Sequence, residues 1–493
     1  MKLLTLFLLL GLSSSLYSQQ CDGCRYISEV FDSVDVVQDV KFGEGINTTG
    51  ALQELFLDIY SPHGDTVTNR PVMIVAFGGG FLYGTRKDAY VEKICRFYAK
   101  TGYVAAAVDY RYGIKLAQPP AIQANEQIRV LFRAMQDMRA AVQYFKHAAD
   151  SGNIYAIDSN LIFLGGVSAG AMSAIYSQYC DSPEKIGQIG DTTEIQQFGG
   201  FWSTSSLYPG YNWKAAAVCN IAGAIYDTAW IEAGDAPIIS VHGDQDATVS
   251  YTEQQSGDLL SFYGFYTEGS FLIDQRAKQV GVCSYLYTIV GGDHPTSSAE
   301  QYYYDNIFNR WMPRMHAIIN RRSFCCNMSL DISGHPAVGG SGSPAYFDAI
   351  ISNAQGNTTT QWCAMPCNFS SNQNAITVTP DTGQYYIALA YDNNCQATDF
   401  VEITKYTSIF SPADFEISLF PSPANRQLLI KTNTTDAVQL NVKLFDVNGK
   451  LWSNQVFYGQ TTLDVAEIAT GLYIVEIQFS DNEVWREKVL ITH

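Results

Sequence analysis

Residues 161–176 read LIFLGGVSAGAMSAIY, and this stretch decides the fold that the sequence predicts. The apolar run 161–164 predicts a short strand, the glycine-rich segment 165–170 a tight turn, and the residues from 171 onward a helix. Inside the turn, GVSAG is a G-x-S-x-G pattern with Ser168 at its centre. On so sharp a turn a serine stands clear of the backbone, and the two glycines remove Cβ atoms that would clash. Ser168 is therefore a candidate nucleophile.

The pattern alone does not separate a nucleophile from an ordinary turn, because the chain has 39 glycines. The expected helix after Ser168 favours the nucleophile, since free N–H groups at a helix N-terminus stabilise developing negative charge. A serine nucleophile also needs a base, an acid that orients the base, and donors for the oxyanion. Those groups have to come from other parts of the chain.

Strand and helix patterns alternate on both sides of this stretch. Two alternating runs within residues 34–60 predict an antiparallel pair of strands. Continuous apolar runs, typical of strands buried on both faces, occupy residues 71–77, 103–108, 214–221, 237–241 and 284–290. Helical patterns occupy residues 88–100, 122–149, 252–265 and 299–319. The alternation predicts an α/β fold, a mostly parallel sheet flanked by helices, with its active site at the carboxyl ends of the strands.

One of the seven histidines fits the role of the base. His294 follows the last expected parallel strand and lies in a glycine-rich loop, and histidine is the residue type best suited to proton transfer near neutral pH. In one common triad order the acid follows the serine, and the histidine comes last. The other histidines precede Ser168, precede the acid, lie in a helix or fall in the C-terminal β region: His63, His147, His242, His316, His335 and His493.

The acid is expected after the preceding strand, in the segment PIISVHGDQDATV at residues 237–249. Asp244 and Asp246 are both candidates. Asp246 is preferred, because the turn after the strand brings the second carboxylate back toward the site. A calcium loop is a poor alternative, since two carboxylates without further spaced ligands do not make one.

Oxyanion donors are expected from backbone N–H groups. One candidate is Ala169, the residue after the serine. The others are Gly79 and Gly80, in the Gly78-Gly79-Gly80 loop that follows the strand at 71–77. A phosphate-binding loop is not indicated there, because the G-x-x-x-x-G-K-[ST] pattern is absent.

Together these segments resemble the α/β-hydrolase superfamily, and most closely its secreted carboxylesterases and lipase-like enzymes with an HGGG-type loop. FGGGF, AVDYR, GGVSAGA, HGDQDATV and GGDH stand in the family's order over residues 31–319. The resemblance implies an α/β-hydrolase fold without cofactor or metal. It also implies Ser168 as the nucleophile, Asp246 as the acid and His294 as the base. The oxyanion donors that it implies are Gly79, Gly80 and Ala169.

The chain departs from that family at one position. Where the family usually has a histidine before the three glycines, this chain has Phe77. That histidine normally braces the loop, so the geometry of the loop has to be set by other residues here.

The character of the sequence changes after residue 320. Residues 321–410 are rich in Ser, Asn, Thr and Gly with short alternating runs, which predicts a small Ig-like β-sandwich. Residues 411–493 predict a second β-sandwich, with Asn448-Gly449 as a hairpin turn. Its segments SLFPSPAN, LFDVNGK, IATGLYIVEI and KVLI resemble the C-terminal sorting domain of type IX secretion substrates. This resemblance implies the type IX secretion machinery as a partner, and a protein that is secreted or attached to the outer cell surface. A carbohydrate-binding β-module is the alternative.

The N-terminus predicts export. Residues 1–18 combine Lys2, an apolar run at 3–12 and small polar residues, which is typical of a signal peptide; an uncleaved anchor is the alternative. The catalytic domain is then expected at residues 19–320, and no other stretch has the length of a transmembrane helix. The 11 cysteines of an exported chain predict disulfides, with at least one thiol left free.

These features favour one function. The net charge of −18 argues against nucleic acid as a partner. We expect an exported serine carboxylesterase that acts on a small-molecule or polysaccharide-linked ester, with acyl and alcohol specificity open. The alternatives are a non-catalytic surface-binding or adhesion protein on a hydrolase fold, and a peptidase or acyltransferase of the same fold.

Overall fold

The computed structural model describes residues 24–115, 120–253, 266–295, 300–333, 345–365, 369–378, 385–402, 417–421, 423–432, 439–447, 449–458, 460–478 and 484–493. The expected signal peptide at 1–18, most of the helix expected at 252–265, and Asn448 of the expected hairpin lie outside these residues. The chain forms two compact units. Unit 1 comprises residues 1–332, 349–374 and 385–401, and unit 2 comprises residues 333–348, 375–384 and 402–493.

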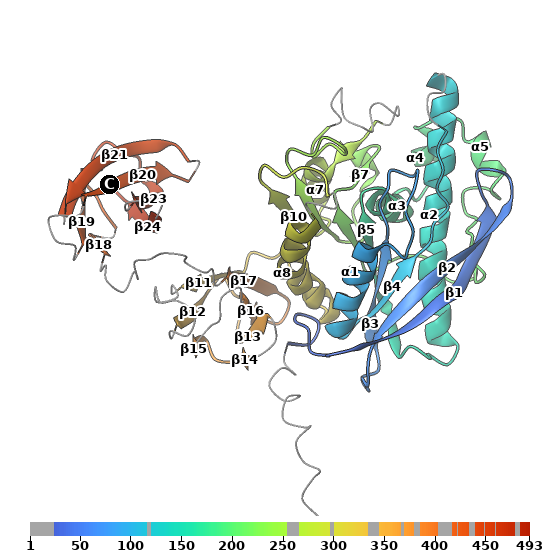
Figure 1. Ribbon diagram of the computed structural model, residues 1–493, viewed down its shortest axis with the longest axis horizontal. Helices are drawn as coiled ribbons and strands as arrows, with labels where there is room; N and C mark the ends of the chain where they lie inside the picture. The colour runs from blue at the N-terminus through green and yellow to red at the C-terminus, as the bar shows by residue number, and fades with distance from the viewer. Residues whose placement is uncertain are drawn as a thin grey trace, which may run out of the picture. The chain divides into compact units, whose positions relative to one another are not determined.

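An eight-stranded sheet lies at the centre of unit 1, with strand order β1-β2-β4-β3-β5-β6-β8-β10 (Figure 1). β1 (Val34–Ile46) and β2 (Leu52–Pro62) are antiparallel, as the alternating pattern predicted. The remaining six strands are parallel to one another. They are β3 (Arg70–Ala76), β4 (Val104–Val108), β5 (Ile157–Val167), β6 (Ala217–Ile221), β8 (Ile238–Gly243) and β10 (Ser284–Ile289). The predicted α/β-hydrolase fold is confirmed.

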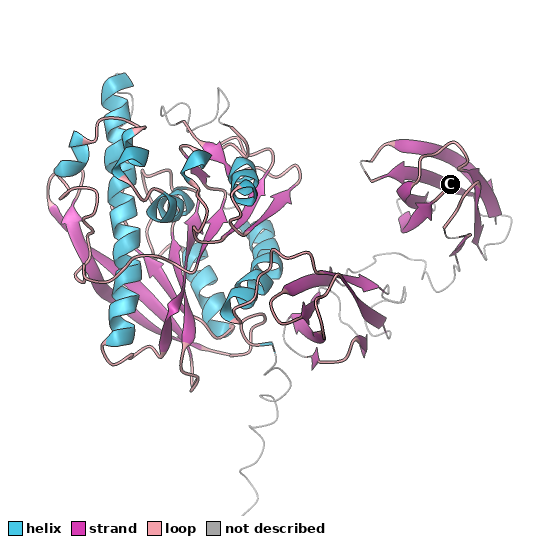
Figure 2. Ribbon diagram, turned by 180° about the vertical axis from the view of Figure 1, so that it is seen from behind, coloured by secondary structure: helices cyan, strands magenta, loops and turns pink. Residues whose placement is uncertain are grey.

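Helices cover both faces of this sheet (Figure 2). The chain crosses from β3 to β4 in one direction and from β4 to β5 in the other, so right-handed crossovers place α1 (Ala89–Lys100) and α2 (Pro120–Asp150) on opposite faces. α3 (Ala169–Tyr179) packs with α2, and α8 (Glu300–Ile319) contacts α1. Every residue of β3, β4, β6 and β8 is buried, which explains their continuous apolar runs.

One helix of the sheet domain was not predicted. α7 (Ser270–Gln279) buries Ser270, Ile273, Asp274 and Ala277, a helical spacing in which half of the side chains are polar. Without an apolar stripe, the periodicity that indicates a helix is absent. The smaller elements around the sheet are α4 (Pro183–Gly187), α5 (Thr193–Gln196), β7 (Ala224–Ile225), a 3₁₀ turn (Thr228–Trp230) and β9 (Glu268–Gly269).

Unit 1 also contains a four-stranded antiparallel sheet in the order β14-β13-β16-β17. These strands are β13 (Thr359–Met365), β14 (Ser370–Ser371), β16 (Tyr385–Tyr391) and β17 (Gln396–Glu402). The N-terminal segment packs on this sheet: Cys24 forms a disulfide with Cys363, and the Ser28 hydroxyl donates to the Ala364 carbonyl at 3.0 Å. β11 (Ser329–Ser333) follows α8 along the chain.

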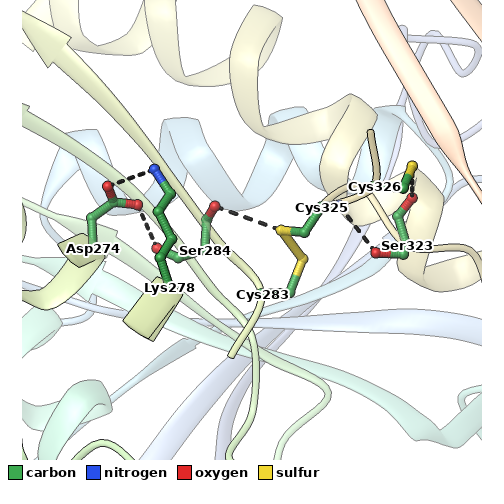
Figure 3. Close-up of a disulfide and its surroundings, with 7 residues drawn as sticks. All are labelled: Asp274, Lys278, Cys283, Ser284, Ser323, Cys325 and Cys326. Atoms are coloured by element: carbon green, nitrogen blue, oxygen red, sulfur yellow. Dashed lines mark hydrogen bonds and ion pairs between the residues drawn. A yellow bond between two sulfur atoms is a disulfide. The ribbon is translucent and has the colours of Figure 1, made fainter. Parts of the chain in front are cut away.

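A second disulfide joins Cys283, just before β10, to Cys325, just after α8 (Figure 3). The Cys325 sulfur lies 3.6 Å from the Ser284 carbonyl oxygen, and the Ser284 hydroxyl donates to Asp274 at 2.7 Å. The last strand of the large sheet is therefore tied to the segment that leaves the domain. Among the described residues, the free thiols are those of Cys95, Cys180, Cys219, Cys326 and Cys395.

Unit 2 consists of antiparallel strands. In the first part, β12 (Ala345–Ser352) pairs with β15 (Ala375–Val378) through residues 345–348. The second part is a seven-stranded sheet in the order β18-β19-β22-β21-β20-β23-β24, with its own apolar core. Its strands are β18 (Ile417–Phe420), β19 (Gln427–Thr432), β20 (Gln439–Asp446), β21 (Leu451–Tyr458), β22 (Gln460–Asp464), β23 (Gly471–Gln478) and β24 (Val484–Ile491). Within the described part of the chain, no helix is long and apolar enough to cross a membrane.

A buried histidine links α8 to the four-stranded sheet of unit 1. His316 Nδ1 lies 3.1 Å from the Gln396 amide oxygen, and the side chain is 8% exposed. Burial lowers the pKa of His316 to about 4, although the hydrogen bond to Gln396 acts in the opposite direction. The folded protein therefore holds this imidazole neutral at a pH where the unfolded chain protonates it.

This difference predicts a pH-dependent stability. Unfolded chains take up the proton below about pH 6.5, so the free energy of unfolding should fall by about 3 kcal/mol as the pH drops from 6.5 to 4, and stay level above that range. His316→Gln removes the titrating group and should flatten this dependence. Urea unfolding of both proteins between pH 7 and pH 4 measures the effect. Equal losses in the two proteins would contradict the prediction.

Candidate active site

Ser168 lies on the turn between β5 and α3, in a strained backbone conformation with φ 56° and ψ −120°. The crossing is so tight that a Cβ atom on Gly166 would lie 2.6 Å from the backbone of Gly170, and one on Gly170 would lie 2.4 Å from the Ala76 and Phe77 carbonyl oxygens. Both positions therefore require glycine. The strain of a positive φ at a serine persists because the surrounding contacts fix it, and such strain is concentrated at functional sites.

His294 lies between Ser168 and Asp246. Its Nε2 atom is 2.9 Å from the Ser168 hydroxyl oxygen, and its Nδ1 atom is 2.6 Å from Asp246 Oδ2. The three side chains come from the ends of β5, β8 and β10, which meet at one edge of the sheet. All three residues are buried, at 6% to 8% exposed. The structure brings together the three residues that the sequence predicted as candidates for nucleophile, base and acid.

The Asp246 carboxylate is fully hydrogen-bonded. Its Oδ1 atom accepts from the Thr248 and Val249 backbone N–H groups, both at 2.8 Å, and its Oδ2 atom contacts two histidines, His294 and His242. Burial by itself would raise the pKa of Asp246, but the hydrogen bonds from His242 and His294 outweigh it and hold this pKa well below its ordinary value. The carboxylate is therefore ionised at neutral pH.

Asp244, the other acid that the sequence left open, faces elsewhere. Its Oδ1 atom accepts a hydrogen bond from the Gly291 N–H group at 2.7 Å, in the loop that leads to His294. This contact ties the two loops together. In the described residues, the Asp244 carboxylate has no hydrogen bond to the imidazole of His294. The preference for Asp246 agrees with this geometry.

The glycine loop, where this chain has Phe77 before the glycines, is held by tyrosines. The Gly78 N–H group donates to the Tyr90 hydroxyl at 2.5 Å, and the Tyr110 hydroxyl donates to the Phe77 carbonyl at 2.9 Å. The Phe77 ring stacks on Tyr110, with ring centroids 4.4 Å apart. A Cβ atom on Gly78 would lie 3.4 Å from the Ser168 Cβ atom, so the loop lies beside the nucleophile.

The three expected oxyanion donors lie in the loop and at the start of α3. Gly79 and Gly80 have φ angles of 116° and 62°, which favour glycine. In the described residues, the backbone N–H groups of Gly79, Gly80 and Ala169 donate to no protein acceptor. They are therefore available to a ligand beside Ser168.

An ion-pair cluster around the buried side chain of Arg86 anchors the segment after the glycine loop. Arg86 forms ion pairs with Asp39 of β1, Asp58 of β2 and Asp109, which directly follows β4. The Arg86–Asp109 contact is 2.5 Å long, and it explains why the AVDYR segment has an aspartate at position 109. Three strands of the sheet thereby fix the segment after the loop.

His242, which the triad order excludes as the base, lies beside Asp246 in the structure. His242 was excluded as a base because its acid would have to precede it, yet its Nε2 atom contacts Asp246 Oδ2, the oxygen that His294 Nδ1 also contacts. The sequence signal for this contact is the spacing of four residues between His242 and Asp246 in HGDQD, with the histidine at the end of a strand. In the described residues, no group of three or more His, Cys, Asp or Glu side chains suits a metal ion.

Two family models match the chain. The BD-FAE model matches residues 57–197, and the model described as secretion system C-terminal sorting domain matches residues 418–492. Both resemblances that the sequence motifs indicated are confirmed. A comparison with curated proteins finds no match.

Similar solved structures are esterases of Thermogutta terrifontis. Esterase 2 phosphorylated by paraoxon is 18% identical, with 57% of this chain and 94% of that chain covered and a TM-score of 0.39. The same esterase phosphoramylated by tabun is 19% identical, with 55% and 90% covered and a TM-score of 0.37. The propionate-bound form is 19% identical, with 54% and 91% covered and a TM-score of 0.36.

The two family matches agree with the described structure. The BD-FAE match covers β3, β4, β5 and the turn at Ser168, and the sorting-domain match covers the seven-stranded sheet of unit 2. The chain thus carries an α/β-hydrolase domain and a C-terminal type IX secretion sorting domain, and it is a protein that is secreted or attached to the outer cell surface.

Proposed function

We propose that this chain is a serine carboxylesterase that hydrolyses carboxylic esters through an acyl-enzyme on Ser168. The observation that carries the proposal is the buried, continuous line of hydrogen bonds from the Ser168 hydroxyl through His294 to Asp246, with contacts of 2.9 Å and 2.6 Å. A nucleophile, a base and an ionised orienting acid in this arrangement are what acyl transfer requires.

The geometry supports a defined sequence of steps. The Ser168 oxygen attacks the ester carbonyl while its proton passes to His294 Nε2, and Asp246 stabilises the imidazolium that forms. The tetrahedral intermediate then releases the alcohol, which takes the proton from His294. Water attacks the acyl-enzyme with His294 as base, and the carboxylic acid leaves.

The oxyanion site is proposed at the N-terminus of α3 and the glycine loop. The free N–H group of Ala169 and those of Gly79 and Gly80 are the donors, and the helix N-terminus adds its positive end. The Tyr90 and Tyr110 contacts fix this loop before substrate binds, so little reorganisation is needed in the transition state.

The substrate proposed is a small-molecule or polysaccharide-linked ester outside the cell. The full chain, expressed and purified, should hydrolyse p-nitrophenyl acyl esters, and a fluorophosphonate probe should label the peptide that contains Ser168. A series from acetyl to longer acyl and feruloyl esters defines the acyl specificity. If the protein shows neither turnover nor labelling, the result favours a surface-binding protein. Preferential amide cleavage would favour a peptidase, and acyl transfer to an alcohol would favour an acyltransferase.

A further inference from the structure

His242 contacts the same carboxylate oxygen of Asp246 that His294 contacts. Its side chain is fully buried at the end of β8, and its Nε2 atom lies 3.1 Å from Asp246 Oδ2. We infer that His242 is a positioning residue, which holds the Asp246 carboxylate toward His294 through a proton on Nε2. This inference rests on the proposed function, because it assigns a part in the same reaction.

The neighbours of Nε2 decide which nitrogen carries the proton. Besides Asp246, Nε2 lies 3.0 Å from the Val249 carbonyl oxygen. Both neighbours are acceptors, since the carboxylate is ionised and a carbonyl has no proton to give. The Nε2 atom of His242 must therefore be protonated, and its N–H group is shared between Asp246 and Val249.

The other ring nitrogen is held by a serine from the helix that the sequence did not predict. His242 Nδ1 lies 2.7 Å from the Ser270 hydroxyl, which accepts from the Asn220 amide at 2.9 Å and lies 3.3 Å from the Gly223 carbonyl oxygen. The hydroxyl proton of Ser270 has two acceptors within reach, and we assign it to Nδ1, because that contact of 2.7 Å is shorter than the 3.3 Å contact with the Gly223 carbonyl oxygen. The ring is thus fixed at both nitrogens.

This network places the acid on rigid elements. Asn220 and Ser240 come from β6 and β8, Ser270 begins α7, and the three side chains are buried and connected by hydrogen bonds. The aromatic ring of Tyr251 packs edge-on against the imidazole, with centroids 5.6 Å apart. Loss of the His242 N–H group leaves His294, among the described residues, as the only side chain on Asp246 Oδ2, and the orientation of the carboxylate then depends on its backbone contacts at Oδ1.

The test compares two replacements of His242. His242→Leu removes the donor, and kcat for a p-nitrophenyl ester should fall on the order of 10- to 100-fold with KM unchanged, the loss expected for a hydrogen bond to a charged group. His242→Gln keeps an amide N–H near the position of Nε2 and should recover most of that loss. Ser270→Ala loosens the ring without touching Asp246 and should give a smaller loss of kcat.

A double-mutant cycle separates positioning from general stability. If His242 acts through Asp246, adding His242→Leu to Asp246→Asn should change kcat little further. An equal loss in both backgrounds, or a normal kcat in His242→Leu, would overturn the inference. Thermal unfolding of each variant shows whether it is folded, and if His242→Leu is not, the cycle is run with Ser270→Ala.

A spectroscopic measurement keeps the inference apart from the proposed function. In the full chain with ¹⁵N-labelled histidine, the ring of His242 should show a protonated Nε2 and an unprotonated Nδ1 at pH 7. A protonated Nδ1 with a bare Nε2 would overturn the inference even where ester turnover is normal. If the expected tautomer is seen but the protein does not hydrolyse esters, the proposed function is contradicted and the position of the proton on His242 is not.

Discussion

Replacing Ser168 by alanine should abolish ester hydrolysis, lowering kcat on the order of a million-fold. The loss is this large because the hydroxyl is the atom that forms the acyl-enzyme, and a base and acid without a nucleophile retain only the help of the oxyanion site. Ser168 is 6% exposed, on a backbone held at φ 56°, and its hydroxyl is the group that lies 2.9 Å from His294 Nε2.

The matched control is a serine on α3, the helix that follows Ser168. Ser177 is also buried, and its hydroxyl donates to the Ala174 carbonyl, well removed from His294. Ser177→Ala should keep its turnover, whereas Ser168→Ala should lose both turnover and labelling by the fluorophosphonate probe. Retained hydrolysis in Ser168→Ala, measured on the same p-nitrophenyl series, would show that another group is the nucleophile.

Asp246→Asn should have the second largest effect, a loss in kcat on the order of ten-thousand-fold. The amide has a shape similar to the carboxylate, but it has no charge to stabilise the imidazolium of His294. It can also present an N–H group to Nδ1, which then has to act as an acceptor, so Nε2 carries the proton and cannot receive another from Ser168.

Asp244→Asn is the matched control for this prediction. Asp244 is two residues away and accepts from the Gly291 N–H group, a hydrogen bond that an amide oxygen can also accept. The loss in kcat should therefore remain below about tenfold, the scale of a weakened neutral hydrogen bond. Steady-state kinetics of the two variants decide the matter, and a larger loss from Asp244→Asn would move the role of the acid to that residue.

The ion pairs and disulfides show how the hydrolase domain is fixed around this site. Cys283–Cys325 ties the start of β10 to the segment after α8, and β10 leads directly into the loop that holds His294. Arg86, with its three carboxylates, fixes the segment after the glycine loop. The two sides of the active site thus have anchors of different chemistry, one covalent and one ionic.

The strands of the large sheet were predictable because of how they are buried. A parallel strand with helices on both faces has no polar side, so runs such as 71–77 are apolar throughout and stand out in the sequence. The turn at Ser168 was predictable because its close backbone contacts admit only glycine at positions 166 and 170. α7 was not predictable, because Ser270 and Asp274 occupy buried positions where a periodic pattern needs apolar residues.

The sequence by itself determined the fold class, the nucleophile turn and the order of the candidate triad, since each depends on local spacing and on the residue types that a turn or a buried strand tolerates. Only the tertiary structure decided that Asp246 and not Asp244 contacts His294, that Tyr90 and Tyr110 hold the glycine loop, and that His242 supports the acid. These contacts join residues from different strands and helices. Their partners are fixed by the way those elements meet at the edge of the sheet, which no local pattern records.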